Sequence, residues 1–233
     1  MSEEIFVWIY FALFIVMILL EVPIGSAMVL SSLLYIVQNG QSFVMFAQKT
    51  ATSFASYSLL AVPAFVFVGC AMNEIGFSDR IFGVAEKAVG HIPGGLGHAN
   101  VLASMIFAGM SGSAMADAGG LGAIEIKAMD DAGYDRGFSV AITAASSGIG
   151  PIIPPSINLV VWGFLAGAST IELFMAGIVP GVLMGLCLML YIYIAVTRFH
   201  VQAPTTPRAT FREFLRALWR GLPALGAPII LLG

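Results

Sequence analysis

Long apolar runs dominate the chain and predict helices. Continuous runs cover residues 5–20, 22–37, 58–73 and 173–196. Each approaches the roughly 20 residues that a helix needs to cross a hydrocarbon core of about 30 Å. A helix satisfies its own backbone hydrogen bonds in lipid, and the runs do not alternate between apolar and polar positions. We therefore expect an all-α polytopic membrane protein.

Other segments mix polar and apolar residues. Residues 41–57 and 77–89 are amphipathic, which is typical of helices that lie along a membrane interface. Residues 198–220 are basic and predict a connector on one side of the membrane. Residues 222–233 begin another apolar run, so we expect the chain to be part of a longer protein.

Two apolar segments are broken in the middle by residues that disfavour helix. Residues 99–124 contain Gly109-Met-Ser-Gly-Ser113, and residues 138–168 contain Ser146-Ser-Gly-Ile-Gly-Pro-Ile-Ile-Pro-Pro-Ser156. Three prolines cannot all sit in one uninterrupted helix. Each half of the first segment would reach about half the hydrocarbon thickness. This predicts a re-entrant hairpin with its tip near the membrane midplane, followed by a charged loop over residues 125–136.

The breaks carry candidate chemistry as well as an unusual backbone. Unwound backbone at membrane depth is tolerated only inside protein or beside a wet cavity. Hydroxyls gather at both breaks: Ser111, Ser113, Thr143, Ser146, Ser147 and Ser156. Hydroxyl and carbonyl oxygens suit a hard cation such as Na⁺, and half-helix N-termini favour a substrate carboxylate. Close packing of small residues is the alternative, and it explains one such break better than two.

Two further polar residues lie near the breaks. Asp117 is a carboxylate well inside an apolar stretch, where an ionisable group is costly and points to function. It would equally serve as a cap for a half-helix at residues 114–118. Asn158 follows the second break, and either a place in the cavity or a structural hydrogen bond fits it.

Composition and charge agree with a membrane protein. Hydrophobic residues make up 59% and charged residues 10% of the chain, against about 25% charged in a soluble domain. If residues 99–124 form a hairpin, every Lys and Arg except Lys49 lies on one side, with the N-terminus outside. If residues 99–124 instead cross the membrane once, only Arg80 and Lys87 lie opposite the other Lys and Arg residues. The charges therefore do not decide between a hairpin and a single crossing. The net charge of −3 indicates no nucleic-acid partner.

The broken segments resemble a known family. Residues 101–117 and 143–157, together with Leu60-Ala-Val-Pro-Ala-Phe65 and Ala176-Gly-Ile-Val-Pro-Gly181, are similar to the large membrane subunit of TRAP transporters, the DctM/SiaM type. The chain departs from the family pattern at Gly119-Gly120 and at Gly148, where a hydroxyl is missing. The resemblance covers nearly the whole chain and corresponds to the N-terminal half of such a subunit.

The resemblance implies an ion-transporter-type inverted-repeat elevator fold, of which this chain would hold the first repeat only. Residues 1–90 would be scaffold helices and interfacial arm helices. Residues 91–170 would be transport-domain elements, with a re-entrant hairpin at about 97–130 and a broken helix at about 137–168. Residues 171–233 would be a scaffold helix, a basic cytoplasmic connector and the start of the next helix.

The resemblance also implies a function. Such subunits work with a small membrane subunit and a periplasmic substrate-binding protein in the bacterial inner membrane, where a sodium gradient drives uptake of an organic acid such as a C4-dicarboxylate or a sialic acid. We therefore expect symport with Na⁺, no organic cofactor, a periplasmic N-terminus, and contact with membrane lipid. No enzymatic activity is expected.

Specific residues follow from the breaks and the resemblance together. The residues predicted to bind Na⁺ are Gly109, Ser111, Gly112, Ser113, Ser146, Ser147, Gly150 and Pro151. The residues predicted to line the substrate cavity are Ser113, Asp117, Pro154, Pro155, Ser156 and Asn158.

Two other functions compete with transport on sequence grounds. Gly109-Met-Ser-Gly112 matches the Gly-x-Ser-Gly of rhomboid-like intramembrane serine proteases, but that chemistry needs a histidine base near the serine. The histidines, His91, His98 and His200, all lie at segment ends. A non-transporting scaffold subunit would have no need for costly unwound backbone.

Overall fold

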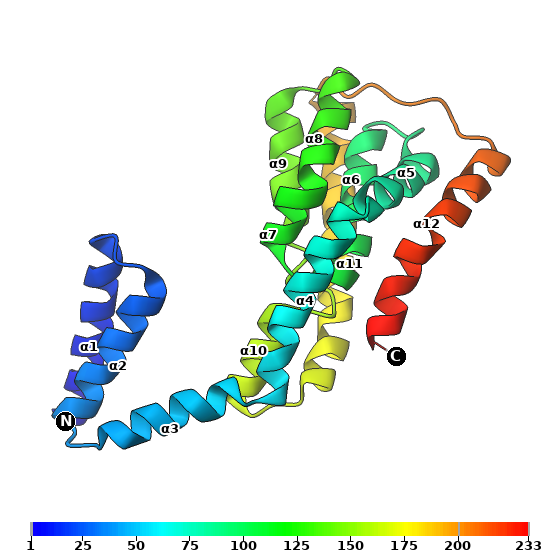
Figure 1. Ribbon diagram of the computed structural model, residues 1–233. Helices are drawn as coiled ribbons and strands as arrows, with labels where there is room; N and C mark the ends of the chain where they lie inside the picture. The colour runs from blue at the N-terminus through cyan, green and yellow to red at the C-terminus, as the bar shows by residue number, and fades with distance from the viewer. Residues whose placement is uncertain (1, 200, 233) are drawn as a thin grey trace. The chain divides into compact units, whose positions relative to one another are not determined.

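A computed structural model describes residues 2–199 and 201–232, and the regular elements in these residues are all helical (Figure 1). The chain divides into two compact units, Met1–Ser56 and Tyr57–Gly233. The expected all-α architecture is therefore confirmed. His200 and the last residue of the expected 171–233 segment lie outside the described residues.

The first unit is a helical hairpin followed by an amphipathic helix. It consists of α1 (Ser2–Leu19), α2 (Ile24–Gln38) and α3 (Phe43–Phe54). The helices α1 and α2 pack together, with the ring of Tyr10 edge-on to that of Tyr35 at 5.6 Å between centroids. Most large apolar side chains of this unit are exposed, which suits a lipid environment.

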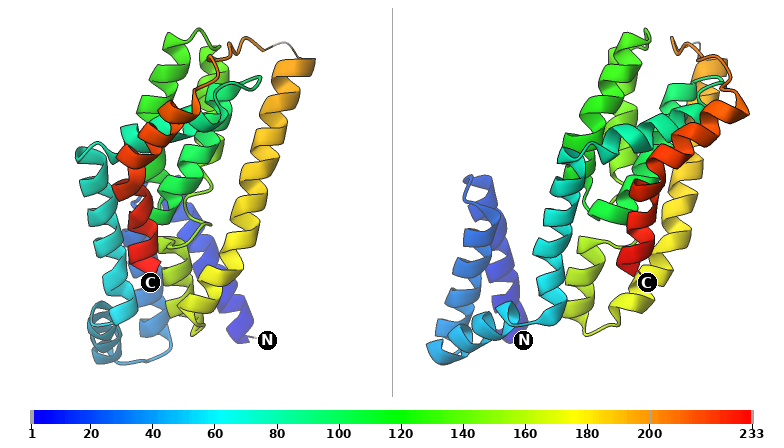
Figure 2. Two further views of the ribbon diagram at one scale, coloured as in Figure 1. Left: turned by 90° about the vertical axis from the view of Figure 1, so that its right-hand side faces the viewer. Right: turned by 45° about the vertical axis from the view of Figure 1, so that its right-hand side comes forward.

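The second unit is built around one central helix. Its elements are α4 (Tyr57–Glu74), α5 (Phe77–Val89), α6 (Gly95–Ser111), α7 (Ala114–Ala116), the π-helical turn η1 (Asp117–Leu121), α8 (Gly122–Asp131), α9 (Arg136–Ser147), α10 (Ile157–Ala166), α11 (Thr170–Arg198) and α12 (Phe211–Leu232). The helix α6 contacts α4, α5, α8, α9, α11 and α12. Figure 2 shows it surrounded by these neighbours. Small residues at α11 allow close approach: a Cβ added at Gly177 would lie 2.5 Å from the Ile152 carbonyl oxygen.

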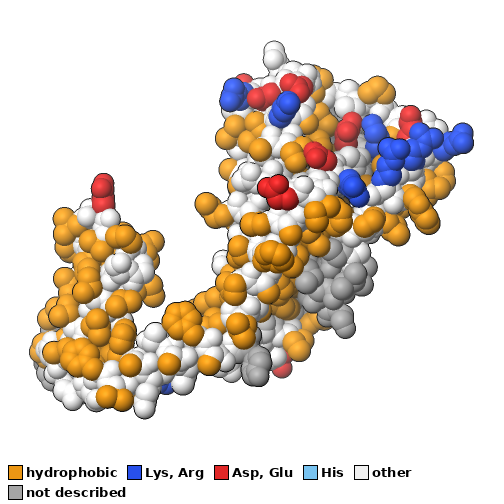
Figure 3. Space-filling model, viewed as in Figure 1, with side chains coloured by type: hydrophobic (Ala, Val, Ile, Leu, Met, Phe, Trp, Pro, Cys, Tyr) orange, Lys and Arg blue, Asp and Glu red, His pale blue; other side chains and the backbone are white. Residues whose placement is uncertain are grey.

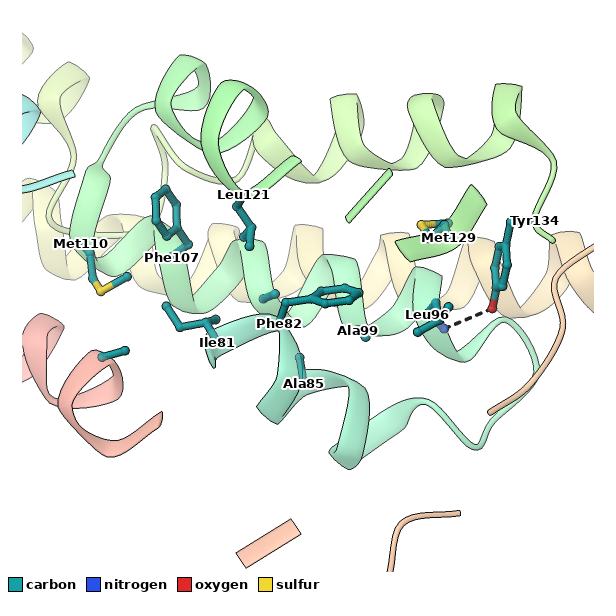
Figure 4. Close-up of a cluster of buried hydrophobic side chains, with 12 residues drawn as sticks. Ile81, Phe82, Ala85, Leu96, Ala99, Phe107, Met110, Leu121, Met129 and Tyr134 are labelled. Carbon is teal, nitrogen blue, oxygen red and sulfur yellow. Dashed lines mark hydrogen bonds between the residues drawn. The ribbon is translucent and has the colours of Figure 1, made fainter. Parts of the chain in front are cut away.

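The helices α6 and α8 form the predicted hairpin. The N–H of Leu96, at the start of α6, donates to the Tyr134 hydroxyl at 3.1 Å, just beyond the end of α8 (Figure 4). The two outer ends of the hairpin therefore meet at one point. Between its arms and α5 lies the main hydrophobic cluster, which includes Ile81, Phe107 and Leu121 and is fully buried.

Element lengths correct three sequence-based expectations. The helix α6 has 17 residues and so spans about 25 Å, longer than the half-thickness expected for residues 99–110. The predicted loop over residues 125–136 is helical as far as Asp131, because Glu125 and Met129 are buried on the inner side of α8. The basic segment 198–220 is also partly helical, since α12 begins at Phe211.

Length and charge bear on membrane placement. Among the described residues, α11 alone is long and apolar enough to span a membrane as a single helix, and a bent helix pair adds at most one more span. Shorter apolar helices occur at Phe6–Leu19, Ile24–Gln38 and Ile157–Ala166. In Figure 3 the charged side chains of the second unit gather toward one end, over α5, α12 and the end of α8. That end suits a membrane–water interface.

Candidate functional site

The tip of the hairpin is a two-residue reversal. The helix α6 ends at Ser111, and Gly112 adopts a left-handed conformation with φ 57° and ψ 17°. Glycine favours this conformation because it has no Cβ. Ser113 is extended, and its hydroxyl accepts a hydrogen bond from the Ala116 N–H at 3.4 Å. Ser113 is therefore the cap of the returning helix.

The second break separates α9 from α10. Residues 148–156 form turns rather than helix, so the predicted interruption is confirmed. The Ser156 hydroxyl donates to the Pro151 carbonyl at 2.6 Å and accepts from the Leu159 N–H at 3.2 Å. One side chain thus stabilises both the irregular segment and the first turn of α10.

The two breaks contact each other through backbone atoms. The Ile157 N–H donates to the Gly112 carbonyl at 3.3 Å. A Cβ added at Gly112 would collide with the Pro155 carbonyl oxygen, and one at Gly150 would lie 3.2 Å from the Ser113 carbonyl. Glycine at both positions therefore permits a close approach that other residues would obstruct. Segments about 40 residues apart in sequence form one structure.

A small hollow of about 200 Å³ opens beside this contact. Gly112, Ser113, Pro151, Ile157 and Asn158 line it together with neighbours in α7. The predicted site residues Pro154, Pro155 and Ser156 are buried in the adjoining loop, and Gly109 and Gly150 are also buried. The volume is below the roughly 300–1,000 Å³ of a typical small-molecule site. The hollow is therefore a part of a substrate site at most.

Behind the tip, buried hydrogen bonds join α6 to α9. The Asn100 side chain donates to the Thr143 hydroxyl at 2.7 Å and accepts from the Ser146 hydroxyl at 2.7 Å. The Ser104 hydroxyl donates to that of Ser146 at 3.2 Å, and Ser147 donates to the Thr143 carbonyl at 2.7 Å. This polar network connects the hairpin to the broken helix inside an otherwise apolar block.

Two carboxyl groups lie next to the network. Asp117 and Glu125 are fully buried, and none of their oxygens has a hydrogen-bond partner among the described residues. Asp117 is near the hydroxyls of Ser104 and Ser147, although neither forms a hydrogen bond of good geometry with it. The capping role considered for Asp117 is wrong, because the cap is Ser113. Asp117 also lies behind the tip rather than among the residues that line the hollow.

Sequence reasoning missed three members of this polar core. The charged residues that follow Glu125 closely predict a loop, whereas the structure continues α8 as far as Asp131. Asn100 and Ser104 lie within an apolar helix. An Asn in such a helix indicates a buried polar contact, because a buried amide needs hydrogen-bond partners. The spacing of four residues places both on one face of α6, toward α9.

Within the described residues, the arrangement offers oxygen ligands and two carboxyl groups that have no ion-pair partner. The Ser111 hydroxyl is buried without a hydrogen-bond partner in the described part of the chain. Buried carboxylates need a cation, a proton or hydrogen bonds to be tolerated. Hydroxyl, carbonyl and carboxylate oxygens are the donors that hard cations such as Na⁺ prefer. The chemistry of this block therefore fits a small cation.

The geometry does not fit a serine protease. Ser111 ends α6 whereas His98 lies in its first turn, about 20 Å away along the helix. His91 lies in the turn just before α6, at the end of that helix opposite to Ser111, where it lines a hollow with Lys87. Neither histidine is within reach to act as a base for the Ser111 hydroxyl.

Comparison with known proteins places the chain in a family. Residues 11–233 match the family described as "Tripartite ATP-independent periplasmic transporter, DctM component". The sialic acid TRAP transporter permease protein SiaT of Haemophilus influenzae is 42% identical over 229 residues, which are 97% of this chain and 37% of that protein. The large permease protein SiaM of Vibrio cholerae is 42% identical over 91% of this chain and 49% of its own length.

A relative with a different substrate in its name is equally similar. The C4-dicarboxylate TRAP transporter large permease protein DctM of Pseudomonas aeruginosa is 42% identical over 76% of this chain and 41% of that protein. The chain thus spans about half or less of the length of these relatives. The match covers both broken segments and the helices around them, so this chain belongs to the DctM-component family of tripartite ATP-independent periplasmic transporters.

Proposed function

We propose that this chain is the first part of the large membrane subunit of a sodium-coupled TRAP secondary transporter. The observation that carries the proposal is the contact between the two breaks, in which the Ile157 N–H donates to the Gly112 carbonyl. Unwound backbone beside buried hydroxyls and unpaired carboxyl groups suits a coupling ion. The ion ligands would come from residues 109–113 and 146–151.

The substrate is an organic acid in this proposal. The names of relatives specify sialic acid, a C4-dicarboxylate, 2,3-diketo-L-gulonate and isethionate. These compounds share an acidic group and little else. Ser156 caps the N-terminus of α10, which lies at the end of the second break. The positive end of this helix dipole suits the acidic group of such an anion. A periplasmic binding protein would deliver the acid, and a small membrane subunit would complete the transporter.

The hairpin supports one placement of the chain in the membrane, which we include in the proposal. Because its outer ends meet, residues 95–131 enter and leave on the same side, and the basic residues other than Lys49 then share that side. With the positive-inside rule this side is cytoplasmic, and the N-terminus is periplasmic in the inner membrane. An elevator movement of the hairpin and broken helix against the remaining helices would carry the site across.

Uptake by the reconstituted transporter tests the proposal. The complete complex containing this chain is placed in vesicles with its binding protein, and uptake of labelled acid is followed with and without an inward Na⁺ gradient. Ser111→Ala and Ser147→Ala should each raise the Na⁺ concentration for half-maximal uptake, by roughly five- to tenfold for the loss of one ligand. Ser32→Ala, an exposed change in α2, is the matched control.

Two outcomes would contradict the assignment. Uptake that does not depend on Na⁺ would exclude sodium coupling. Unchanged Na⁺ dependence in both site variants would place the ion elsewhere in the protein.

A further inference from the structure

The helix α12 presents three different faces along its first three turns. One face packs on α5, where a Cβ added at Gly221 would lie 2.7 Å from Val84. A second face is an exposed apolar stripe made of Phe211, Leu215, Trp219 and Leu222. A third carries the cations Arg212, Arg216 and Arg220, four residues apart. A helix with a packed face, an apolar face and a basic face suits a membrane interface.

Beside the start of α12 lies a hollow of about 340 Å³ with basic walls. Lys87 and His91 line it from the end of α5 and the turn after it, and Arg208 lines it from the connector. Phe211 and Phe214 of α12 supply apolar walls. Its volume is within the range of small-molecule sites. Its lining residues come from the end of α5, the connector and the start of α12. Figure 3 shows charged side chains gathered over α5 and α12.

The connector that supplies Arg208 is held in place. The Thr206 N–H donates to the Gly90 carbonyl at 3.1 Å. The Tyr134 hydroxyl donates to the Pro204 carbonyl at 2.9 Å. These two bonds fix the backbone shortly before Arg208, so the wall of the hollow is formed before any ligand binds.

The acidic side chains near the hollow do not neutralise all of the cations around it. Glu86 pairs with Lys87 at 3.4 Å. Glu213 accepts a hydrogen bond from the Thr210 N–H at 2.8 Å, and this bond holds the pKa of the Glu213 carboxyl below its ordinary value. Glu213 thus serves as part of the cap of α12. Arg208, with Arg212 and Arg216 beyond it, has no ion-pair partner within 4.0 Å in the part of the chain that the structure describes.

We propose that this hollow binds the phosphate headgroup of an anionic phospholipid. The cations would contact the phosphate, and the stripe from Phe211 to Leu222 would contact the acyl chains. A free phosphate would use the cations but leave the stripe without a role, so the two features together indicate a lipid. The site is separate from the breaks and does not depend on the transport proposal.

Lipid retention by the purified full-length transporter tests the site. Native mass spectrometry compares added phosphatidylglycerol with added phosphatidylcholine in the same detergent. Lys87→Gln with Arg208→Gln removes two cations from the hollow, and Lys127→Gln with Arg136→Gln removes two exposed cations elsewhere at the charged end. Each contact to an anionic headgroup is worth about fivefold in affinity. The first pair should therefore weaken phosphatidylglycerol retention by roughly 25-fold, with the second pair unchanged.

Thermal unfolding, salt dependence and competition with inorganic phosphate distinguish headgroup binding from other causes of lipid loss. Thermal unfolding without lipid should be the same for both pairs, because all four side chains are exposed. Rising salt should weaken phosphatidylglycerol retention, as expected for charge contacts. Equal retention of the two lipids, or equal loss in the two variant pairs, would overturn the proposal. Displacement of the lipid by an equimolar amount of inorganic phosphate would overturn it too, since the ligand would then be a free anion.

Discussion

Replacement of Gly112 by alanine is the most direct perturbation of the contact between the breaks. The φ of 57° places this residue in the left-handed region, which costs an L-residue with a Cβ about 1–2 kcal/mol. The new methyl group would also collide with the Pro155 carbonyl oxygen and approach the Ile157 nitrogen at 3.1 Å. These are backbone atoms and cannot rotate away, so overpacking adds about 1–3 kcal/mol. The total is about 2–5 kcal/mol.

Thermal unfolding of the purified protein measures this effect. A loss of this size should lower Tm by roughly 5–15 °C. Gly119→Ala is the matched control, because it lies in the same hairpin, and an added Cβ there would meet no atom within 4 Å. Unfolding of the Gly112 variant at the temperature of the Gly119 variant would refute the close backbone contact.

Three further variants test the polar core and the base of the hairpin. Glu125→Gln should raise Tm in buffer without Na⁺, because it removes a buried carboxyl group that has no hydrogen-bond partner, whereas Lys127→Gln on the exposed face should not. Asn100→Ala should destabilise the protein by about 2–3 kcal/mol in a denaturant titration, because it leaves the buried Thr143 hydroxyl without its partner and removes one of the acceptors of the Ser146 hydroxyl; the same change at exposed Asn158 should cost little. Burial raises the pKa of the Tyr134 hydroxyl, so its contribution to stability is fully present below the ordinary value of about 10 and is lost as pH rises through the folded-state pKa. Tyr134→Phe should therefore lower Tm at pH 8 and flatten the decline of Tm above pH 10, and an unchanged alkaline decline would show that another group causes it.

The sequence predicted the helices and both breaks because the signals are local. Apolar length marks α1, α2 and α11, and the prolines between α9 and α10 exclude a continuous helix. The break at Gly112 is predictable because two interruptions rich in glycine and serine occur close together in apolar segments, and close packing explains one such break better than two. These predictions need no knowledge of what lies opposite each residue.

The polar core could not be predicted in the same way because its members come from different helices. Whether Glu125 is buried depends on the faces of α8 that α6 and α9 cover. The wide π-helical turn Asp117–Leu121 at the start of the returning arm shifts the faces of the residues that follow it, Glu125 among them. A pattern read along one segment does not contain such pairings.

The hydrogen bond from Ile157 to Gly112 restricts how this half of the molecule changes shape. An outward swing of the hairpin tip alone would break the hydrogen bond that the Ile157 N–H donates to the carbonyl of the buried Gly112, while α6 and α9 stay joined through Asn100. Tip and broken helix are instead expected to travel as a single rigid body. A gate that opens when one segment separates from its neighbours would then have to be formed by residues other than the hairpin tip.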